Sequence, residues 1–344
     1  MTEQMTSRER VLAAFRGEEY DRIPLISPVS LANIECMKLS RAYFPHANLN
    51  SNKMAALAET SYTVLKFDSV MPYFWIANEA GALGCNVDWG GSERMPSVNG
   101  SVLRSLDDFK MPQNYLDRRP IRTVINAVSL LKRRHQDQVA IIGKVLGPLS
   151  LIFYMYGIQN TLTSLVLEPE KVMQLLDEVK DLCIAFAHAQ IEAGADAITI
   201  SEDAVGDLIS RECYRNVVMQ AEKRLYEAIA DQAYTIFHLS CDIMDRADLF
   251  AETGFHALSF DSRNDIGRLK KLTGDMKLIG SVNVPATLLS GKRETVANEA
   301  YYYLQNGVDM LAPECAITLR VSNENLLEMH ETILRYEKNK RRLG

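Results

Sequence analysis

The chain has 344 residues, of which 47% are hydrophobic and 24% charged, and this composition is enough to build one large domain or two small ones. The formal net charge is −6 and the basic residues are scattered, apart from a short "KNKRR" near the C-terminus, so no basic surface for nucleic acid is indicated. The N-terminus lacks the apolar region of a signal peptide, and no stretch reaches the ~18 uncharged apolar residues that span a bilayer. We therefore expect a cytoplasmic protein with neither nucleic acid nor membrane as a partner.

Short apolar runs alternate with amphipathic stretches along the chain. "TSRE" (6–9) has the form of a capping box, so residues 1–20 are expected to contain an extra N-terminal helix. The best internal helix is expected within 168–195, where apolar residues recur every three or four positions and Gly194 ends the pattern. The candidate strands are, in chain order, 22–26, 69–73, 139–145, 197–201, 234–240, 257–261, 277–283 and 309–315.

Eight such strands alternating with helices predict a parallel sheet that is buried on both faces. In a chain of this length they favour an α/β fold of the closed (β/α)8 TIM barrel type over an open doubly wound sheet, with residues 1–344 as a single domain. No GxGxxG follows the early strands and no GxxxxGK[ST] occurs, which argues against dinucleotide and P-loop sites. Residues 75–120 are rich in Gly, Pro and Asn, and we expect this excursion to lie over the barrel mouth.

The reactive groups of a TIM barrel lie at the carboxyl ends of its strands. Here the predicted strand ends are strongly polar for positions that close apolar runs. They carry Tyr73, Lys144, Ser201, Glu202, Asp203, His238, Ser240, Cys241, Asp261, Asn283 and Cys315.

Four of these residues have the side chains that Zn²⁺ prefers. They are His238, Cys241, Asp261 and Cys315, from strands that a barrel would bring to one mouth. Each also has an ordinary alternative. His238 could be a hydrogen-bonded structural residue, Cys315 an apolar filler, and Asp261 the cap of a helix that begins near Asn264. The other four cysteines, Cys36, Cys85, Cys183 and Cys213, are expected to be structural, without disulfides.

Glu202 and Asp203 are two adjacent carboxylates at a predicted strand end. Together with Asn283 they are the candidate catalytic residues, suited to proton transfer or substrate positioning. A solvated loop is the alternative interpretation of the two carboxylates.

Several motifs resemble the uroporphyrinogen decarboxylase superfamily over residues 6–335. They include "ALGCNVDWG", "EAGADAITISEDAVGDLIS", "GFHALSFDSR", "LIGSVNVPATLLSG" and "NGVDMLAPECAI". Within the superfamily the chain looks most like the methylcobamide:coenzyme M methyltransferase branch. That resemblance implies a TIM barrel and a zinc site made of a His-x-Cys pair, a distant Cys in an "APxC" context and an acidic residue.

The resemblance places His238, Cys315 and Asp261 at three of the four zinc positions. The second residue of the His-x-Cys pair would fall at 240, where this chain has Ser240, with Cys241 next to it. Consecutive strand residues face opposite ways, so Cys241 reaches the metal only if the strand ends or bulges there. We favour Cys241 because serine is a poor zinc ligand. Without it the site would be His, Cys and Asp with water or Glu202.

The implied activity is zinc-dependent methyl transfer between a corrinoid protein and a small molecule. Zinc would deprotonate a thiol acceptor, such as coenzyme M, or polarise the oxygen of a methoxy donor in O-demethylation. Tyr73 and Tyr154 are the candidate cofactor-binding residues, in an aromatic pocket. The corrinoid is expected on a partner protein, since no Asp-x-His-x-x-Gly motif is found, and a second copy of the chain is the other partner considered.

The alternative function is uroporphyrinogen decarboxylation in tetrapyrrole biosynthesis. A porphyrinogen carries many carboxylates and needs several cations in its pocket. The arginine-rich motif that the decarboxylases carry after the first strand is absent here, where only Arg41 is present.

Overall fold

The computed structural model describes residues 4–202 and 205–343. Its strands are β1 (Ser69–Val70), β2 (Asn86–Asp88), β3 (Ser97–Asn99), β4 (Ala140–Leu146), β5 (Ala197–Ser201), β6 (Tyr234–Leu239), β7 (Ala257–Phe260) and β8 (Lys277–Ile279). Its α-helices are α1 (Ser7–Arg16), α2 (Ile34–Ser40), α3 (His46–Leu49), α4 (Ser51–Ala58), α5 (Thr60–Thr63), α6 (Ala77–Ala82), α7 (Arg119–His135), α8 (Pro148–Tyr156), α9 (Ile158–Leu167), α10 (Pro169–Glu192), α11 (Arg211–Cys213), α12 (Met219–Ile229), α13 (Ala247–Ala251), α14 (Ile266–Thr273), α15 (Arg293–Gln305) and α16 (Asn323–Leu343). The chain also contains two short 3₁₀-helices, η1 (Leu106–Asp108) and η2 (Tyr115–Asp117). Two short π-helices are η3 (Tyr214–Val218) and η4 (Val284–Leu289).

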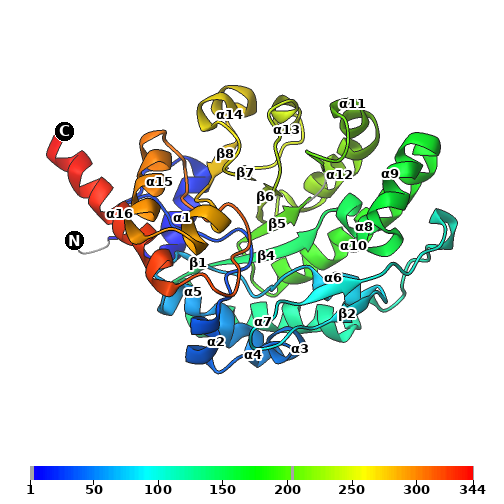
Figure 1. Cartoon of the computed structure of the whole chain (residues 1–344), viewed down its shortest axis with the longest axis horizontal. Helices are drawn as coiled ribbons and strands as arrows, with labels where there is room; N and C mark the ends of the chain where they lie inside the picture. The colour runs from blue at the N-terminus through cyan, green and yellow to red at the C-terminus, as the bar shows by residue number, and fades with distance from the viewer. Residues whose placement is uncertain (1–3, 203–204, 344) are drawn as a thin grey trace.

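The centre of the molecule is a parallel sheet with the strand order β1-β4-β5-β6-β7-β8. Each of these strands coincides with a segment predicted from the sequence, and helices surround the sheet (Figure 1). The strands from β4 to β7 are buried almost throughout, which explains their continuous apolar runs. This is the TIM-barrel-like α/β architecture that the alternation predicts.

The two remaining predicted strands, 22–26 and 309–315, form isolated bridges beside the sheet. Leu25 pairs in parallel with Leu311, while Met310 pairs with Ile279 at the end of β8. The backbone N–H of Asp68, just before β1, donates to the carbonyl of Leu25 at 2.6 Å. Backbone hydrogen bonds therefore run from the β8 edge through these two segments to the β1 edge.

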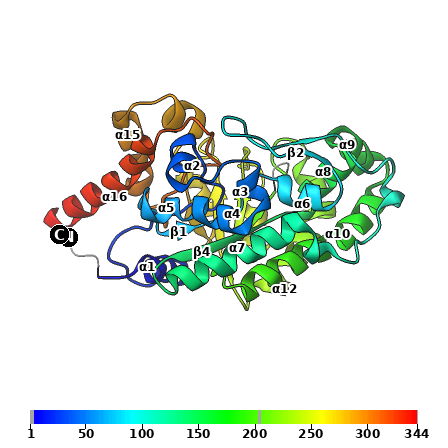
Figure 2. The ribbon, with the colours of Figure 1, turned by 90° about the horizontal axis from the view of Figure 1, so that it is seen from below.

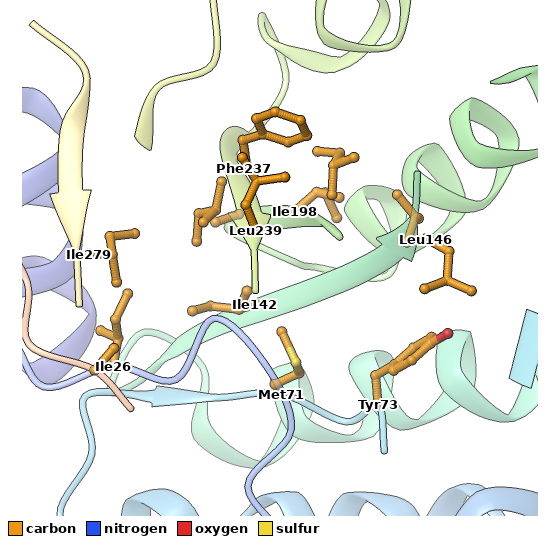
Figure 3. Close-up of a cluster of buried hydrophobic side chains, with 14 of the residues drawn as sticks. Ile26, Met71, Tyr73, Ile142, Leu146, Ile198, Phe237, Leu239 and Ile279 are labelled. Atoms are coloured by element: carbon orange, nitrogen blue, oxygen red, sulfur yellow. The ribbon is translucent and has the colours of Figure 1, made fainter. Parts of the chain in front are cut away.

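The longest internal helix, α10, follows the predicted periodicity. It begins at Pro169, whose missing N–H group would have no acceptor in the first turn. It ends just before Gly194, whose φ of +112° suits glycine. Its buried face packs on β4. Figure 3 shows part of the core, with Ile26, Ile142 and Ile279 contributed by segments far apart in the sequence.

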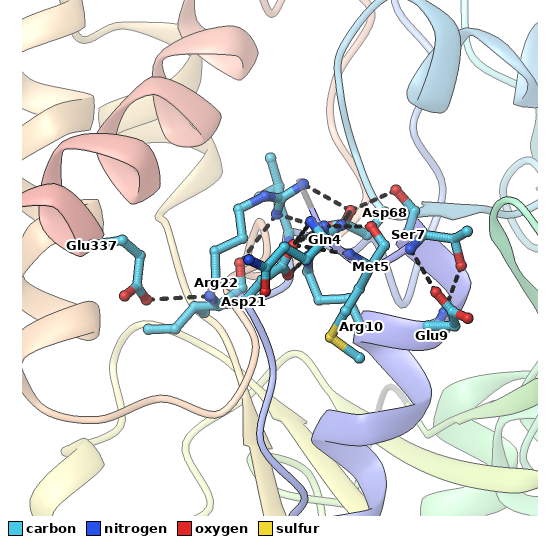
Figure 4. Close-up of polar contacts among 12 residues, drawn as sticks. Gln4, Met5, Ser7, Glu9, Arg10, Asp21, Arg22, Asp68 and Glu337 are labelled. Carbon is cyan, nitrogen blue, oxygen red and sulfur yellow. Dashed lines mark hydrogen bonds and ion pairs between the residues drawn. The ribbon is translucent and has the colours of Figure 1, made fainter. Parts of the chain in front are cut away.

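A polar network fastens the N-terminal helix α1 to the sheet. The capping box predicted at Thr6 and Glu9 is present. The fully buried Arg10 of α1 donates to Asp68 at 2.7 Å (Figure 4). Arg22, which follows α1, donates to both oxygens of the same carboxylate. Asp21 accepts two further hydrogen bonds from Arg10.

The excursion at 75–120 contains α6, the antiparallel β2–β3 pair and the two 3₁₀ turns. The N–H groups of Val102 and Leu103 both donate to the carbonyl of Met155 in α8. In Figure 2, α6 lies beside α8, with which it is in contact. Because α8 directly follows β4, the excursion packs at the carboxyl end of that strand. Among the described residues, no helix combines the length and the apolar character needed to cross a membrane.

Candidate functional site

The carboxyl ends of β4 to β7 direct one row of side chains away from the surrounding helices. Residues in register on neighbouring parallel strands project from the same face of a sheet, and Ser201, His238 and Ser259 are in register. Lys144 and Thr199 are in register one layer below. The opposite face is marked by Gly143, where an added Cβ would lie 2.7 Å from Gln190 of α10. The row containing His238 and Lys144 therefore lies on the concave face of the curled sheet, away from the helices.

His238 is the centre of a short chain of polar contacts in this row. Its Nδ1 lies 2.9 Å from Ser259 Oγ, and its Nε2 lies 3.0 Å from Ser240 Oγ. Ser240 in turn donates to Cys315 Sγ at 3.0 Å. His238 and Cys315, which are far apart in the sequence, therefore both contact the hydroxyl group of Ser240. Their Nε2 and Sγ atoms lie no more than about 6 Å apart, because each is 3.0 Å from the same oxygen.

Burial, assisted by the positive charge of Lys144, lowers the pKa of His238 to about 3. The imidazole is therefore neutral at physiological pH, the form that binds metals. Because Ser259 engages Nδ1, the ring orientation is fixed and Nε2 faces Ser240 and Cys315.

Two of these side chains are donors that suit zinc. The imidazole nitrogen and the thiol are good zinc donors, and their separation is compatible with binding one ion, whose bonds to N and S are about 2.0–2.3 Å. The third neighbour is a serine hydroxyl, which is a weak zinc donor. Across 4–202 and 205–343, no three His, Cys, Asp or Glu side chains gather with the spacing of a metal site.

The side chain of Cys241 packs against Gly206, where an added Cβ would lie 2.3 Å from Sγ. Burial, with the charge of Asp207, raises the pKa of this thiol to about 12, although the N–H of Gly206 opposes the shift. Ser240, and not Cys241, makes the contacts to His238 and Cys315. A ligand role for Cys241 therefore requires the strand end to turn.

Asp261 follows β7 and is held by Arg263. The Arg263 side chain donates to Oδ1 at 3.0 Å and to Oδ2 at 3.2 Å, and its backbone N–H also donates to Oδ1. The suggestion that Asp261 caps the next helix is wrong, because Asp265 is the N-cap of α14. For Asp261 to bind a metal, its pairing with Arg263 would have to loosen.

Glu202 is buried and anchors the start of α8. Its Oε1 accepts from the N–H of Leu149, and its Oε2 accepts from the N–H and the hydroxyl of Ser150. A carboxylate at a helix N-terminus satisfies free N–H donors and interacts favourably with the helix dipole. The solvated-loop interpretation is therefore wrong for Glu202, and Asp203 lies outside the described residues.

Asn283 lies at the start of η4 and has a structural set of partners. Its Oδ1 accepts from the N–H of Ala286, and its Nδ2 donates to Ser262 and to Glu314. Glu314, next to Cys315, also accepts from the N–H groups of Ser262 and Val284. This carboxylate joins the loops after β7 and β8 to the segment that carries Cys315.

Tyr73 and Tyr154, the candidate cofactor-binding residues, have different environments. Tyr73 is fully buried, and its hydroxyl donates to Glu79 at 2.7 Å. The Tyr154 carbonyl accepts from Cys85 Sγ at 3.4 Å, and this residue is partly buried. Burial raises the pKa of Glu79 to about 7, against the hydrogen bonds from Tyr73 and Leu146 and the charge of Lys144.

The sequence argument passed over Ser259, Glu79 and Glu314. The strand register supplies a signal for Ser259, since it lies directly opposite His238. Glu79 lies in α6 of the excursion, away from any predicted strand end, so the strand-end argument does not reach it. Glu314 precedes Cys315 directly and was within reach of the strand-end argument.

Comparison with known proteins gives a consistent result. A family model described as uroporphyrinogen decarboxylase (URO-D) matches residues 6–336. The methylcobamide:CoM methyltransferase MtbA of Methanosarcina acetivorans is 31% identical over 340 residues, which cover 98% of this chain and 100% of that protein. A methylated-thiol–coenzyme M methyltransferase of Methanosarcina mazei is 28% identical and covers 95% of this chain and 88% of its own length.

A solved structure of a methyltransferase from Methanosarcina mazei matches with a TM-score of 0.92 and 26% identity, over 97% of this chain and 99% of that one. By contrast, the uroporphyrinogen decarboxylase of Syntrophotalea carbinolica is 26% identical over 182 residues, only 51% of this chain and 52% of that protein.

Proposed function

The chain belongs to the uroporphyrinogen decarboxylase (URO-D) family, and we propose that within it this protein is a corrinoid-dependent methyltransferase. The methyl group would move between a cobamide and a small thiol or methoxy compound. Similarity to methyltransferases along nearly the whole chain supports this activity, whereas the similarity to a decarboxylase covers about half. We therefore do not propose the alternative of porphyrinogen decarboxylation.

The observation that carries the proposal is the contact of His238 and Cys315 through Ser240 in the sheet interior. We propose these two residues as zinc ligands, with Cys241 or Ser240 and Asp261 at the remaining positions. Zinc, when bound, would lower the pKa of a thiol substrate or polarise the oxygen of a methoxy group. Ser259 holds the His238 ring, and Nε2 of the neutral imidazole faces Ser240 and Cys315.

The substrate sulfur loses its proton and forms a bond to the methyl carbon as the cobalt–carbon bond breaks, with the electron pair staying on cobalt as Co(I). In the opposite direction, Co(I) forms a bond to the methyl carbon as the methyl–oxygen bond breaks, and the oxygen leaves with the electron pair and takes a proton from solvent to give an alcohol or phenol. The corrinoid is proposed to arrive on a separate protein in the cytoplasm. We also propose that residues 24–26 and 309–311 close the sheet into an eight-stranded barrel. The excursion would then lie near the mouth of this barrel.

Glu202 supports the site as a positioning residue, because it fixes α8 beside the polar row. Asp203 and Asn283 as catalytic residues, and Tyr73 and Tyr154 as walls of the corrinoid or methoxy pocket, stay predictions. A substitution that changes kcat at unchanged stability would support a role in the reaction.

Methyl transfer with free cobalamin tests the activity without the partner protein. Methylcobalamin is incubated with a panel of thiols, and Co(I) cobalamin with methoxy aromatic compounds, while the cobalamin spectrum is followed. We expect turnover in one of the two series. Zinc-loaded protein without turnover in either series would refute the proposal.

Metal analysis tests the ligands separately from turnover. We expect about one zinc per chain, lost in His238→Ala and in Cys315→Ala. Zinc loss in Cys241→Ser would assign the third position to Cys241, whereas full zinc content in this variant and tighter binding in Ser240→Cys would assign it to position 240. Unchanged zinc in both alanine variants would refute the site.

A further inference from the structure

Lys144 places a cation inside the sheet, next to the proposed reaction centre. The residue lies on β4 and is 4% exposed, in the row that also carries Thr199 and, one layer further toward the carboxyl ends, His238. Two residues of a strand span about 6.6 Å, a distance that a lysine side chain can cover. The Lys144 side chain can therefore reach the layer of His238.

The ammonium group of Lys144 lacks the partner that such burial normally requires. Its Nζ lies 5.2 Å from the centre of the Tyr73 ring, a weak cation–π contact. Among the described residues, no carboxylate lies within ion-pair distance of it and it donates no hydrogen bond. Buried charges are costly unless they are paired and hydrogen-bonded. The charge of Glu79 acts on Lys144 only at longer range, so within the described part of the chain the ammonium group has free donors for a bound anion.

A second polar group in this layer is also unused. Thr199 is fully buried, and its Oγ1 has no hydrogen-bond partner in the described part of the chain. Its register partner on the neighbouring strand is Lys144. Buried hydroxyl groups are nearly always paired in folded proteins. A cation and a free hydroxyl donor on adjacent strands are complementary to an anionic oxygen.

We propose that Lys144 and Thr199 form an anion subsite that binds the charged end of the small methyl donor or acceptor. The substrate would carry a carboxylate, sulfonate or phenolate group, and its reactive sulfur or ether oxygen would lie toward His238 and Cys315. The inference rests on the proposed function for the identity of the ligand. The subsite itself rests on the two unpartnered groups and their register.

Matched substrate pairs test the subsite. The thiols are 2-mercaptoethanesulfonate and 3-mercaptopropionate against neutral 2-mercaptoethanol, and the methoxy compounds are 4-methoxybenzoate against anisole. In Lys144→Met we expect KM for the charged members to rise about tenfold or more, with KM for the neutral members and the zinc content unchanged. The exposed Lys171→Met, on α10, is the matched control and should leave all values unchanged.

Calorimetric titration with ethanesulfonate and with benzoate separates this inference from the proposed function, since neither compound has a thiol or a methoxy group. Binding to the wild type that is lost in Lys144→Met supports the subsite even if no methyl transfer is found. Methyl transfer with equal KM for charged and neutral substrates would overturn the subsite and leave the proposed function intact.

Thr199→Val keeps the shape of the side chain and removes only the hydroxyl. We expect it to weaken binding of both anions about three- to tenfold. If Lys144→Met does not fold, Thr199→Val and Lys144→Gln take its place. Unaltered anion binding in both Thr199→Val and Lys144→Gln would then refute the subsite.

Discussion

Removal of the negative charge from Asp68 should strongly destabilise the protein. The carboxylate is fully buried and accepts hydrogen bonds from Arg10, Arg22, the Ser7 hydroxyl and the Leu25 N–H. Asp68→Asn preserves the shape of the side chain but leaves two buried guanidinium groups without this anion. Breaking a buried ion pair by removing one partner costs about 3–5 kcal/mol, and Asp21 offsets part of the loss only at Arg10.

Urea unfolding followed by circular dichroism measures this change. The control is Asp117→Asn, which removes the charge from an exposed ion pair with Arg122. Exposed pairs contribute about 0–1 kcal/mol, so the control should unfold almost as the wild type does. A loss in Asp68→Asn below about 1 kcal/mol, no larger than in the control, would refute the assignment of Asp68 as the anchor of α1.

Three further predictions concern stability. Partial burial alone would raise the pKa of Asp21, but Arg10 and backbone N–H donors lower it to about 2. The stabilisation by the Asp21 carboxylate, about 1–2 kcal/mol, should be complete above pH 4 and decline as the pH falls toward 2. The urea midpoints of wild type and Asp21→Asn should therefore converge at low pH, and a constant difference would contradict this role of Asp21. Glu202→Gln should lower the unfolding free energy by about 1–3 kcal/mol, measured in urea, and an unchanged midpoint would contradict its anchoring role. Gly206→Ala should destabilise the protein by a similar amount, because the added Cβ would lie 2.3 Å from Cys241 Sγ. Adding Cys241→Ala should recover part of this loss, and no recovery would indicate that Cys241 has already turned away from Gly206.

The sequence predicted the long periodic elements best. The apolar spacing in α10 and the runs at β4 to β6 were sufficient, because burial of one helix face or of a whole strand dictates them. The β2–β3 pair was not predicted, since its strands are only three residues long and partly exposed. Short elements of this kind depend on tertiary contacts more than on pattern.

The candidate site was predictable in its location but not in its side-chain directions. The rule that function lies at strand ends brought His238 and Cys315 together across a large sequence separation. Ser240 and Cys241 could not be distinguished, because β6 ends at Leu239 and the alternation of faces lapses there. The engagement of Asp261 by Arg263 depends on local loop geometry, which spacing does not encode.

The pairing of Leu25 with Leu311 has a consequence for biosynthesis. The β8 edge and the side of the Leu25 segment that faces away from β1 lack backbone partners until the segment around Leu311 has been synthesised. A nascent chain stalled earlier would expose unsatisfied strand edges, the surfaces through which partly folded chains aggregate. A chain truncated before residue 309 should therefore be insoluble.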